Sequence, residues 1–259
     1  MKLSIITVVY NNLSGLKKTT ESILPLPDNA EWIIVDGAST DGTENFIHTI
    51  SSQNIHVLSE CDHGIFNAMN KGIVLANGEY LIFMNSGDYF NRDEFLKFEH
   101  ILGTNQSDII VCNYFPIDVK NNIGYARKMT DINSLCHYDN IPHQSTFIAK
   151  KVFDCIGLYD DKSYRYVADY EFFLRAYKSN CTFIYLSNKY LSYFIQDGVS
   201  YNYGNAFAIA KEYRIVQKKH CLKYSKKIQI IYFIKYILQS ISFIDPILRK
   251  ILFTKRRNT

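Results

Sequence analysis

The stretch 62–88, DHGIFNAMNKGIVLANGEYLIFMNSGD, decides the fold of this chain. An acidic turn at its start leads into a predicted amphipathic helix over 65–76, and Gly78 separates this helix from an apolar strand over 80–84. The strand ends in the polar cluster 85–88, Asn-Ser-Gly-Asp. A buried strand that carries a carboxylate beside a glycine at its carboxyl end is typical of the ligand site of an open α/β sheet.

The residues before this stretch alternate between strand and helix patterns. Apolar, β-rich runs predict strands over 3–9, 32–35 and 55–58, and apolar residues at helical spacing predict helices over 13–24 and 43–50. Strands that alternate with helices usually pair in parallel, with right-handed crossovers. This half of the chain therefore predicts a Rossmann-like nucleotide-binding unit with a mostly parallel sheet.

The second half of the chain follows a less regular pattern. Strands are predicted over 109–113, 147–149 and 182–186, and a helix of aromatic and aliphatic residues opens near Asp169 and continues to Tyr177. This order predicts a mixed sheet joined to the parallel one, as expected of a unit that binds an acceptor. The sequence therefore predicts an α/β fold in two halves.

Length and charge predict a domain with a basic appendage. A chain of 259 residues, 47% of them hydrophobic, fits one large domain or a domain plus an appendage. Residues 211–259 hold thirteen Lys or Arg against two acidic residues, a charge of +11, which leaves about −7 of the net +4 for residues 1–210. The six cysteines form no CxxC pair, so we expect reduced thiols of a cytosolic protein.

The basic tail, residues 211–259, has an apolar stripe. Apolar residues recur at a spacing of three and four from Ile230 to Leu252, with basic clusters at both ends. The longest charge-free run, 236–244, is far shorter than the ~20 residues that a membrane-crossing helix needs. Such amphipathic helices are typical of the membrane interface, where anionic lipid attracts the basic ends. Alternatively, the stripe packs on the domain or pairs a dimer; its aliphatic character argues against nucleic-acid binding.

Four carboxylates occupy positions typical of ligand sites. Asp36 and Asp62 follow predicted strands, Asp88 follows the most apolar strand of the first half, and Asp169 opens a helix. Each has a simpler interpretation, because Asp is also favoured in turns and at the starts of helices. Hard divalent ions take one or two carboxylates together with substrate phosphates, so Asp88 alone is sufficient for a site that the ligand completes. Lys71 either reaches a phosphate or is solvated.

Several segments occur in a characteristic order: SIITVVYNN (4–12), IIVDGASTDGT (33–43), the stretch 62–88, His143-Gln144 and ADYEFFLR (168–175). In this order they resemble family 2 glycosyltransferases of the GT-A fold. The resemblance covers about residues 1–200. It is closest to bacterial enzymes that build capsule, colanic-acid-like or O-antigen polysaccharides.

The resemblance implies a role for each segment. Asp169 would be the catalytic base, and Asp88 would hold Mg²⁺ or Mn²⁺ on the diphosphate of the donor. Asp36 would contact the nucleobase, expected to be uracil, while Asp62 and Lys71 would flank the base and ribose. The implied nucleotide-sugar-binding residues are Thr7, Val9, Asn11, Asp36, Asp62, Lys71, Ser86 and Gly87, and His143 and Gln144 would belong to a loop that contacts the donor or acceptor.

The sequence departs from the family pattern at two places. Asn85-Ser86-Gly87-Asp88 retains one carboxylate of the DxD-type motif, which would weaken the affinity for metal. Ala168 precedes Asp169 where the family's ED motif has Glu, and this leaves the base itself intact.

The implied activity is a metal-dependent, inverting sugar transfer from a nucleotide-diphosphate sugar, expected to be a UDP-sugar. The acceptor would be a hydroxyl of a saccharide or lipid-linked saccharide in bacterial surface polysaccharide synthesis. The expected location is cytoplasmic, peripheral on the inner face of the cytoplasmic membrane. The alternative is a non-catalytic protein of the same fold that binds nucleotide sugars or acts as a scaffold. A dehydrogenase is disfavoured, because no G-x-G-x-x-G follows any predicted strand.

Overall fold

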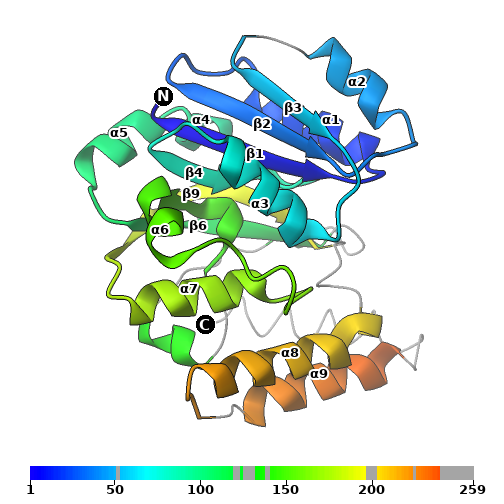
Figure 1. Ribbon diagram of the computed structural model, residues 1–259, viewed down its shortest axis with the longest axis vertical. Helices are drawn as coiled ribbons and strands as arrows, with labels where there is room; N and C mark the ends of the chain where they lie inside the picture. Colours follow the sequence, from blue (N-terminus) through cyan, green and yellow to red (C-terminus); the bar gives the residue numbers. More distant parts are fainter. Residues whose placement is uncertain are drawn as a thin grey trace.

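A nine-stranded sheet organises the chain, with helices packed against it and a pair of helices at one end (Figure 1). This computed structural model describes residues 1–50, 53–118, 123–124, 132–137, 141–196, 203–223 and 226–239. The strands are β1 (Leu3–Val9), β2 (Ala30–Asp36), β3 (Ile55–Ser59), β4 (Tyr80–Phe83), β5 (Tyr89–Phe90), β6 (Ile109–Asp118), β7 (Ile123–Gly124), β8 (Thr146–Ala149) and β9 (Phe183–Ile195). Their order in the sheet is β3-β2-β1-β4-β8-β6-β9-β5, and β7 pairs with β6.

The helices connect these strands and extend beyond the last one. They are α1 (Leu13–Ile23), α2 (Thr43–Thr49), α3 (Ile65–Leu75), α4 (Arg92–Phe95), α5 (Phe98–Thr104), α6 (Lys150–Ile156), α7 (Ala168–Lys178), α8 (Ala206–Lys219) and α9 (Lys226–Gln239). Short 3₁₀ turns are η1 (Ile132–Cys136), η2 (His143–Ser145) and η4 (Tyr203–Asn205).

The first half is the predicted parallel sheet. β1 pairs in parallel with both β2 and β4, and β2 pairs in parallel with β3. Every residue of β1 and β2 is buried, which explains why both strands are nearly continuous apolar runs. The register places Val9 beside Asp36, and Asp36 beside Ser59. The carboxyl ends of these three strands therefore meet at one edge of the sheet.

Helix α3 packs closely on this sheet at Gly72. A Cβ at Gly72 would lie 2.5 Å from Ile6 Cγ2, so a glycine is required where α3 meets β1. This contact fixes the position of α3, the helix that follows Asp62 and contains Lys71. The stretch that decides the fold thus forms α3 and β4 as predicted.

The second half is mixed, again as predicted. β8 runs antiparallel to β4 and β6, whereas β9 runs parallel to β6 and antiparallel to β5. The strand predicted over 182–186 is too short, because β9 continues to Ile195. The register of β6 and β9 shifts between Cys112 and Tyr114, so β9 bulges at its exposed polar residues and then resumes pairing.

Helix α8 belongs to the folded core. Ile209, Tyr213 and Val216 are buried, and the Tyr213 ring lies 4.9 Å from that of Tyr170 on α7 (centroid to centroid). The predicted division between residues 210 and 211 therefore falls inside α8. Charge alone suggested that division, whereas the buried face of α8 joins the start of the basic segment to the domain.

A buried ionic cluster joins α7 to the end of α8. The Glu171 carboxylate is fully buried and lies 3.0 Å from Arg175 Nη2, 3.0 Å from Lys219 Nζ and 3.2 Å from His220 Nε2. Burial raises the pKa of Glu171, but the hydrogen bond with His220, the charge of Arg175 and the hydrogen bonds with Lys219 and Arg175 outweigh it and lower the pKa to about 2, from an ordinary value of 4.5.

This cluster predicts a stability that depends on pH. A carboxyl group with a lowered folded-state pKa stabilises the fold above its ordinary pKa, and this contribution disappears as the pH falls through the folded value. We expect Glu171→Gln to lower the free energy of unfolding by about 3 kcal/mol at pH 7 and by less than half of that near pH 3. Urea denaturation at both pH values measures it, with Glu44→Gln at an exposed position of α2 as the control. A deficit equal at both pH values would contradict the assignment.

Helix α9 lies outermost, against α8 (Figure 1). Among its described side chains, five are apolar and 40–58% exposed: Ile230, Ile231, Phe233, Ile234 and Ile237. No helix within the described ranges is long and apolar enough to cross a bilayer. The predicted continuation of the stripe to Leu252, with its final basic cluster, lies outside the described residues.

Candidate functional site

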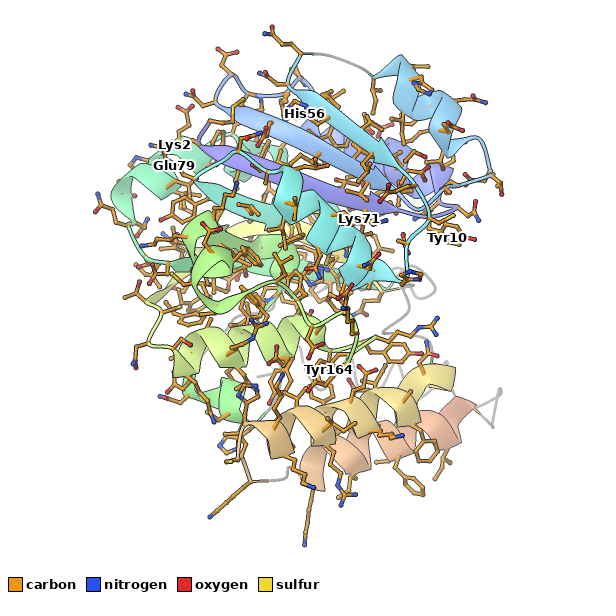
Figure 2. The ribbon with its side chains drawn as sticks, viewed as in Figure 1. Lys2, Tyr10, His56, Lys71, Glu79 and Tyr164 are labelled. Carbon is orange, nitrogen blue, oxygen red and sulfur yellow. The ribbon has the colours of Figure 1, made fainter. Side chains whose placement is uncertain are left out.

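Tyr10, Gly37 and Asp62 meet where β1, β2 and β3 end. Tyr10 directly follows β1 and is 65% exposed; Figure 2 shows it at the same side of the molecule as Lys71. A Cβ at Gly37 would lie 2.5 Å from Asp62 Oδ2 and 3.3 Å from Tyr10 Cδ2, so the glycine leaves room for both side chains. An exposed aromatic ring beside a carboxylate can stack on a nucleobase and accept hydrogen bonds from it.

Asn11 and Asp36 stabilise the turns at the corner that Tyr10, Gly37 and Asp62 form. Asn11, at a φ of 47°, donates its backbone N–H to Ser39 Oγ at 2.8 Å and accepts from the Thr40 backbone N–H at 2.8 Å. Asp36 is fully buried and accepts from the Ser39 backbone N–H at 3.2 Å and from Ser59 Oγ at 2.7 Å. Both predicted nucleotide-binding residues thus shape the site, and the Asp36 carboxylate lies beneath its surface.

Thr7, Val9 and Lys71 are held by other partners. Thr7 is fully buried and accepts a hydrogen bond from Trp32 Nε1 at 2.9 Å, and Val9 packs in the core. Lys71 Nζ lies 2.8 Å from both the Cys61 carbonyl and Glu60 Oε1. The side chains of Thr7 and Val9 therefore do not reach the site surface, and Lys71 braces the loop between β3 and α3.

The turn after β4 is held by α1. Asn12 Nδ2 donates to the carbonyl and hydroxyl oxygens of Ser86 at 3.1 and 3.2 Å. Thr19 Oγ1 donates to the Asp88 carbonyl at 2.7 Å and accepts from the Gly87 backbone N–H at 3.0 Å. Gly87 has a φ of 104°, a conformation that favours glycine. Ser86 and Gly87 therefore present a fixed backbone beside Asp88.

Asp88 lies under this turn. It is 4% exposed, and Oδ1 accepts from the Ile195 backbone N–H at 2.8 Å while Oδ2 accepts from Gln144 Nε2 at 3.2 Å. These contacts tie β9 and η2 to the end of β4.

His143, the neighbour of Gln144 in η2, contacts Asp169. His143 Nδ1 lies 3.2 Å from Asp169 Oδ2, and His143 Nε2 lies 3.1 Å from Asn85 Nδ2. With the Asn85 amide donating to Nε2, Nδ1 carries the proton and donates to Asp169. Consecutive residues of η2 thus contact the two carboxylates predicted as cation ligand and base. His143 and Gln144 thus link Asp169 to Asp88.

Asp169 occupies the second position of α7, so Val167 rather than Asp169 is the helix-capping residue. Its side chain is 15% exposed, and Oδ1 accepts from the Tyr170 backbone N–H at 2.9 Å. Tyr159 lies close by: burial, with a further contribution from the Asp169 charge, raises the pKa of its phenol well above the ordinary value. The base candidate therefore borders a neutral, buried aromatic group.

The side-chain oxygens in the turn after β4 are of the kind that a hard divalent cation takes as ligands. Among the described residues the buried Asn85 Oδ1 has no hydrogen-bond partner, and the Asp88 carboxylate lies three residues further on, with Oδ1 accepting from Ile195 and Oδ2 from Gln144. Such a cation takes few protein oxygens and completes its shell with phosphate and water. Within the described part of the chain no group of three or more His, Cys, Asp or Glu side chains could hold a metal by itself. A cation here would depend on the diphosphate.

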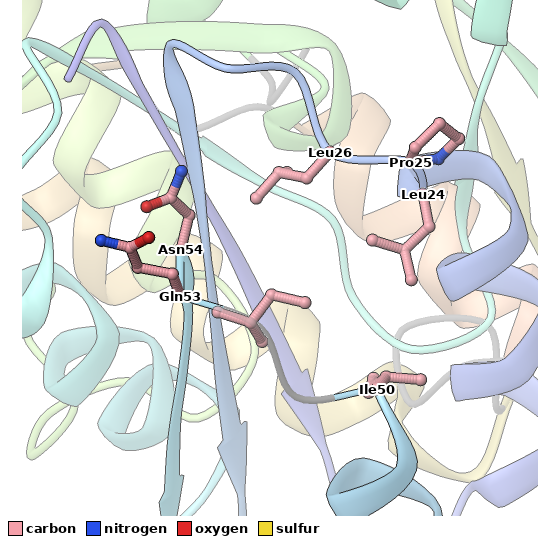
Figure 3. Close-up of a pocket in the computed structure, with 7 residues that line it drawn as sticks. Leu24, Pro25, Leu26, Ile50, Gln53 and Asn54 are labelled. Atoms are coloured by element: carbon pink, nitrogen blue, oxygen red, sulfur yellow. The ribbon is translucent and has the colours of Figure 1, made fainter.

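Two hollows differ in chemistry. One of about 360 Å³ lies beside the strand ends and is lined by Asn11, Asn12, Leu13, Ser14, Lys17 and Asp41. Another, of about 630 Å³, lies at the amino-terminal end of β3, lined by residues 24–26, 50 and 53–55 (Figure 3). The described residues that line the second hollow are apolar or carry amide side chains.

The sequence-based prediction gives no binding role to Tyr10 or to Asn85, although Asn85 opens the polar cluster that ends in Asp88. A large aromatic residue directly after the first strand was the available signal for Tyr10. The contacts of Asn85 with His143 join positions 58 residues apart, and no local pattern indicates them.

Comparisons with known proteins converge on sugar transfer. The model of the family described as glycosyl transferase family 2 matches residues 4–167. The chain is 28% identical over 154 residues to a PGL/p-HBAD biosynthesis glycosyltransferase of Mycobacterium bovis, covering 58% of this chain and 59% of that protein. It therefore spans less than two thirds of the length of that relative. An uncharacterized glycosyltransferase of Mycobacterium tuberculosis is 29% identical over 183 residues, covering 67% of this chain and 68% of the relative.

Solved structures support the fold. S. aureus TarS 1-349 in complex with UDP-GlcNAc aligns with a TM-score of 0.64 at 18% identity, covering 94% of this chain and 73% of that one. The mannosyltransferase PcManGT from Pyrobaculum calidifontis, in complex with GDP-Man and Mn²⁺, aligns with a TM-score of 0.62 at 15% identity, covering 92% and 69%.

Proposed function

This chain belongs to glycosyl transferase family 2, and on that premise we propose that it is an inverting, metal-dependent transferase of a sugar from a UDP-sugar. The acceptor is a hydroxyl of a saccharide or lipid-linked saccharide in the synthesis of a bacterial surface polysaccharide. One observation carries the proposal: His143 and Gln144, consecutive in η2, contact Asp169 and Asp88. A base for the acceptor and a ligand for the donor's diphosphate therefore lie on either side of one short segment.

The nucleotide would bind at the corner formed by Tyr10, Gly37 and Asp62. The exposed Tyr10 ring stacks on the base, and the carboxylate of Asp62, directly over Gly37, accepts hydrogen bonds from the base or ribose. The UDP-GlcNAc and UDP complexes of the structural neighbour TarS support a uridine nucleotide. Asp36 and Asn11 support this corner from below through their turns.

The diphosphate would lie over the turn 85–88. Asn85 Oδ1 and the Asp88 carboxylate would hold Mg²⁺ or Mn²⁺ there, and the bound cation supplies positive charge that stabilises the departing diphosphate. The Mn²⁺ in the complex of PcManGT is consistent with this use of a metal.

Asp169 would then act as the general base. His143 Nδ1–H donates to Asp169 Oδ2 and fixes the carboxylate, which leaves lone pairs for the proton of the acceptor hydroxyl. The acceptor oxygen forms a bond to the anomeric carbon as the bond from that carbon to the diphosphate oxygen breaks. The proton moves to Asp169 and the electron pair leaves with the diphosphate. A single displacement of this kind inverts the anomeric centre.

The outer face of α9 would contact an anionic membrane surface, at the inner face of the cytoplasmic membrane. Its exposed aliphatic and aromatic side chains belong to a segment with a charge of +11 over residues 211–259. This placement would bring the site to a lipid-linked acceptor.

A flotation experiment tests the membrane contact. We expect the full chain to float with phosphatidylglycerol vesicles and Phe233→Ser with Ile234→Ser to lower the partition coefficient by about tenfold or more, because two half-exposed apolar side chains are lost. Val74→Ser on α3, at a position that is 71% exposed, is the matched control. Equal flotation of the parent and the double variant would reject a membrane role for α9.

A donor panel tests the activity. The protein is incubated with UDP-glucose, UDP-galactose, UDP-N-acetylglucosamine and GDP-mannose in the presence of Mn²⁺, and slow release of the nucleotide diphosphate is measured. Donor hydrolysis that requires Asp169 supports an enzyme. Donor binding without any turnover, with or without saccharide acceptors, would instead indicate a non-catalytic nucleotide-sugar-binding protein.

A further inference from the structure

The amino end of α7 is closed by a carboxylate from α8. Glu212 Oε1 accepts from the Arg165 backbone N–H at 2.9 Å, and Oε2 accepts from those of Tyr166 at 2.8 Å and Val167 at 3.2 Å. These three residues lead directly into α7, which begins at Ala168. One side chain, 45 to 47 residues away in sequence, therefore satisfies three consecutive backbone donors.

We infer that Glu212 is a positioning residue for the catalytic base. Asp169 follows Val167 by two residues, so the place where α7 begins determines where the Asp169 carboxylate meets His143, at 3.2 Å. A negative group at the start of a helix is also favoured by the helix dipole. The inference rests on the proposed role of Asp169 as the base.

The surroundings of Glu212 fit this role. It is the one acidic residue of α8, whose other charged residues are Lys211, Arg214, Lys218 and Lys219. The hydrogen bond between Tyr166 Oη and Asn205 Oδ1, at 3.3 Å, joins the same two segments. The family match ends at Val167, so both Asp169 and Glu212 lie beyond it. Helix α8 is thus a part of the catalytic unit that the family match does not include.

A second contact between α7 and α8 allows the positioning of Asp169 to be tested separately from the docking of α8. The cluster around the Glu171 side chain joins the two helices through Arg175, Lys219 and His220; the Glu171 backbone N–H also donates to the Val167 carbonyl at 3.1 Å, and a side-chain substitution keeps that bond. Loss of Glu171 therefore weakens the docking of α8, whereas loss of Glu212 frees the start of α7. A small displacement of a catalytic group lowers the rate by up to about a hundredfold.

The test uses the full chain with UDP-N-acetylglucosamine and Mn²⁺ as the probe donor, or the donor that the panel identifies. We expect Glu212→Ala to lower kcat between about tenfold and a hundredfold with the KM for donor unchanged, and Glu212→Gln, which keeps one acceptor oxygen, to fall between Glu212→Ala and the parent. Lys211→Ala, the exposed neighbour, and Glu171→Gln, compared per folded molecule, are the controls and are expected to keep kcat. Hydrogen exchange at the amides of 165–167 is expected to accelerate in Glu212→Ala only.

Three results would overturn the inference. The first is an unchanged kcat in Glu212→Ala although the amides of 165–167 exchange faster. The second is a loss of activity in proportion to the unfolded fraction, which marks a structural role alone. The third is full activity of Asp169→Asn, measured in parallel, which would remove the proposed base and the inference with it. In the first two cases an inactive Asp169→Asn shows that the proposed function survives.

Discussion

Asp169→Asn is expected to lower the rate of sugar transfer by about 10³-fold while the affinity for the donor stays within about twofold of the parent. Asparagine has nearly the shape of aspartate and keeps one oxygen that accepts from His143 Nδ1, so the contact at 3.2 Å can persist while the acceptor for the Tyr170 backbone N–H is lost. What is lost is the lone pair of an ionised group that takes the proton from the acceptor. The rate is measured by nucleotide release and donor affinity by calorimetry.

Asp154→Asn is the matched control for this variant. Asp154 is an exposed residue of α6, so the same change of charge and shape there is expected to leave both rate and affinity unaltered. Turnover retained in Asp169→Asn would reject the base assignment. Weak donor binding in Asp169→Asn would instead place Asp169 at the nucleotide, which its contact with His143 does not suggest.

The parallel half of the fold could be predicted from sequence because its signals are local. β1 and β2 are buried along their whole length, and such strands read as apolar, β-branched runs separated by amphipathic helices. The length of β9 could not be predicted in the same way. Its pairing with β6 continues past an exposed polar bulge, and only the partner strand determines where pairing resumes.

The candidate site shows the same division between local and distant contacts. The positions of Asp62 and Asp88, shortly after β3 and β4, could be predicted because parallel strands end at a common edge of the sheet. Local chemistry could not separate a ligand from a turn residue: Asp41, in the turn between β2 and α2, accepts from the backbone N–H groups of both Thr43 and Leu13. The predicted nucleotide contact Asp36 stabilises its own turn instead of opening to the surface.

The contacts around the proposed base could not be predicted from the sequence, although His143 itself was expected in a loop near the donor or acceptor. His143 lies 26 residues before Asp169, and Glu212 accepts from residues 45 to 47 positions earlier in the chain. A histidine after a proline and a glutamate in a basic helix are each ordinary in isolation. His143 and Glu212 reach the first turn of α7 only because η2 and α8 pack beside it. The packing of the core determines this arrangement.

Substitutions of Asp88 are expected to weaken donor binding strongly, and the contacts of its carboxylate determine which substitution tests this best. Its carboxylate has a structural duty, since it accepts from the Ile195 backbone N–H, in addition to its proposed contact with the cation. Asp88→Asn removes the charge but keeps an oxygen for Ile195. Asp88→Ala removes both, and the buried N–H of Ile195 then lacks its partner. The two variants therefore separate metal binding from folding.

We expect Asp88→Asn to abolish the gain in donor affinity that Mn²⁺ gives the parent, a loss of about a hundredfold, with little change in the free energy of unfolding. Loss of an outer-shell partner already costs about 10- to 100-fold in metal affinity, and a direct ligand contributes at least as much. Asp88→Ala should show the same loss and a further deficit of about 1–3 kcal/mol in stability. Calorimetry with UDP-N-acetylglucosamine, with Mn²⁺ and with a chelator, measures the first effect, and urea denaturation measures the second. If Asp88→Asn gains as much affinity from Mn²⁺ as the parent does, the carboxylate acts only through Ile195 and Gln144, and the charge of the diphosphate must be balanced by other groups.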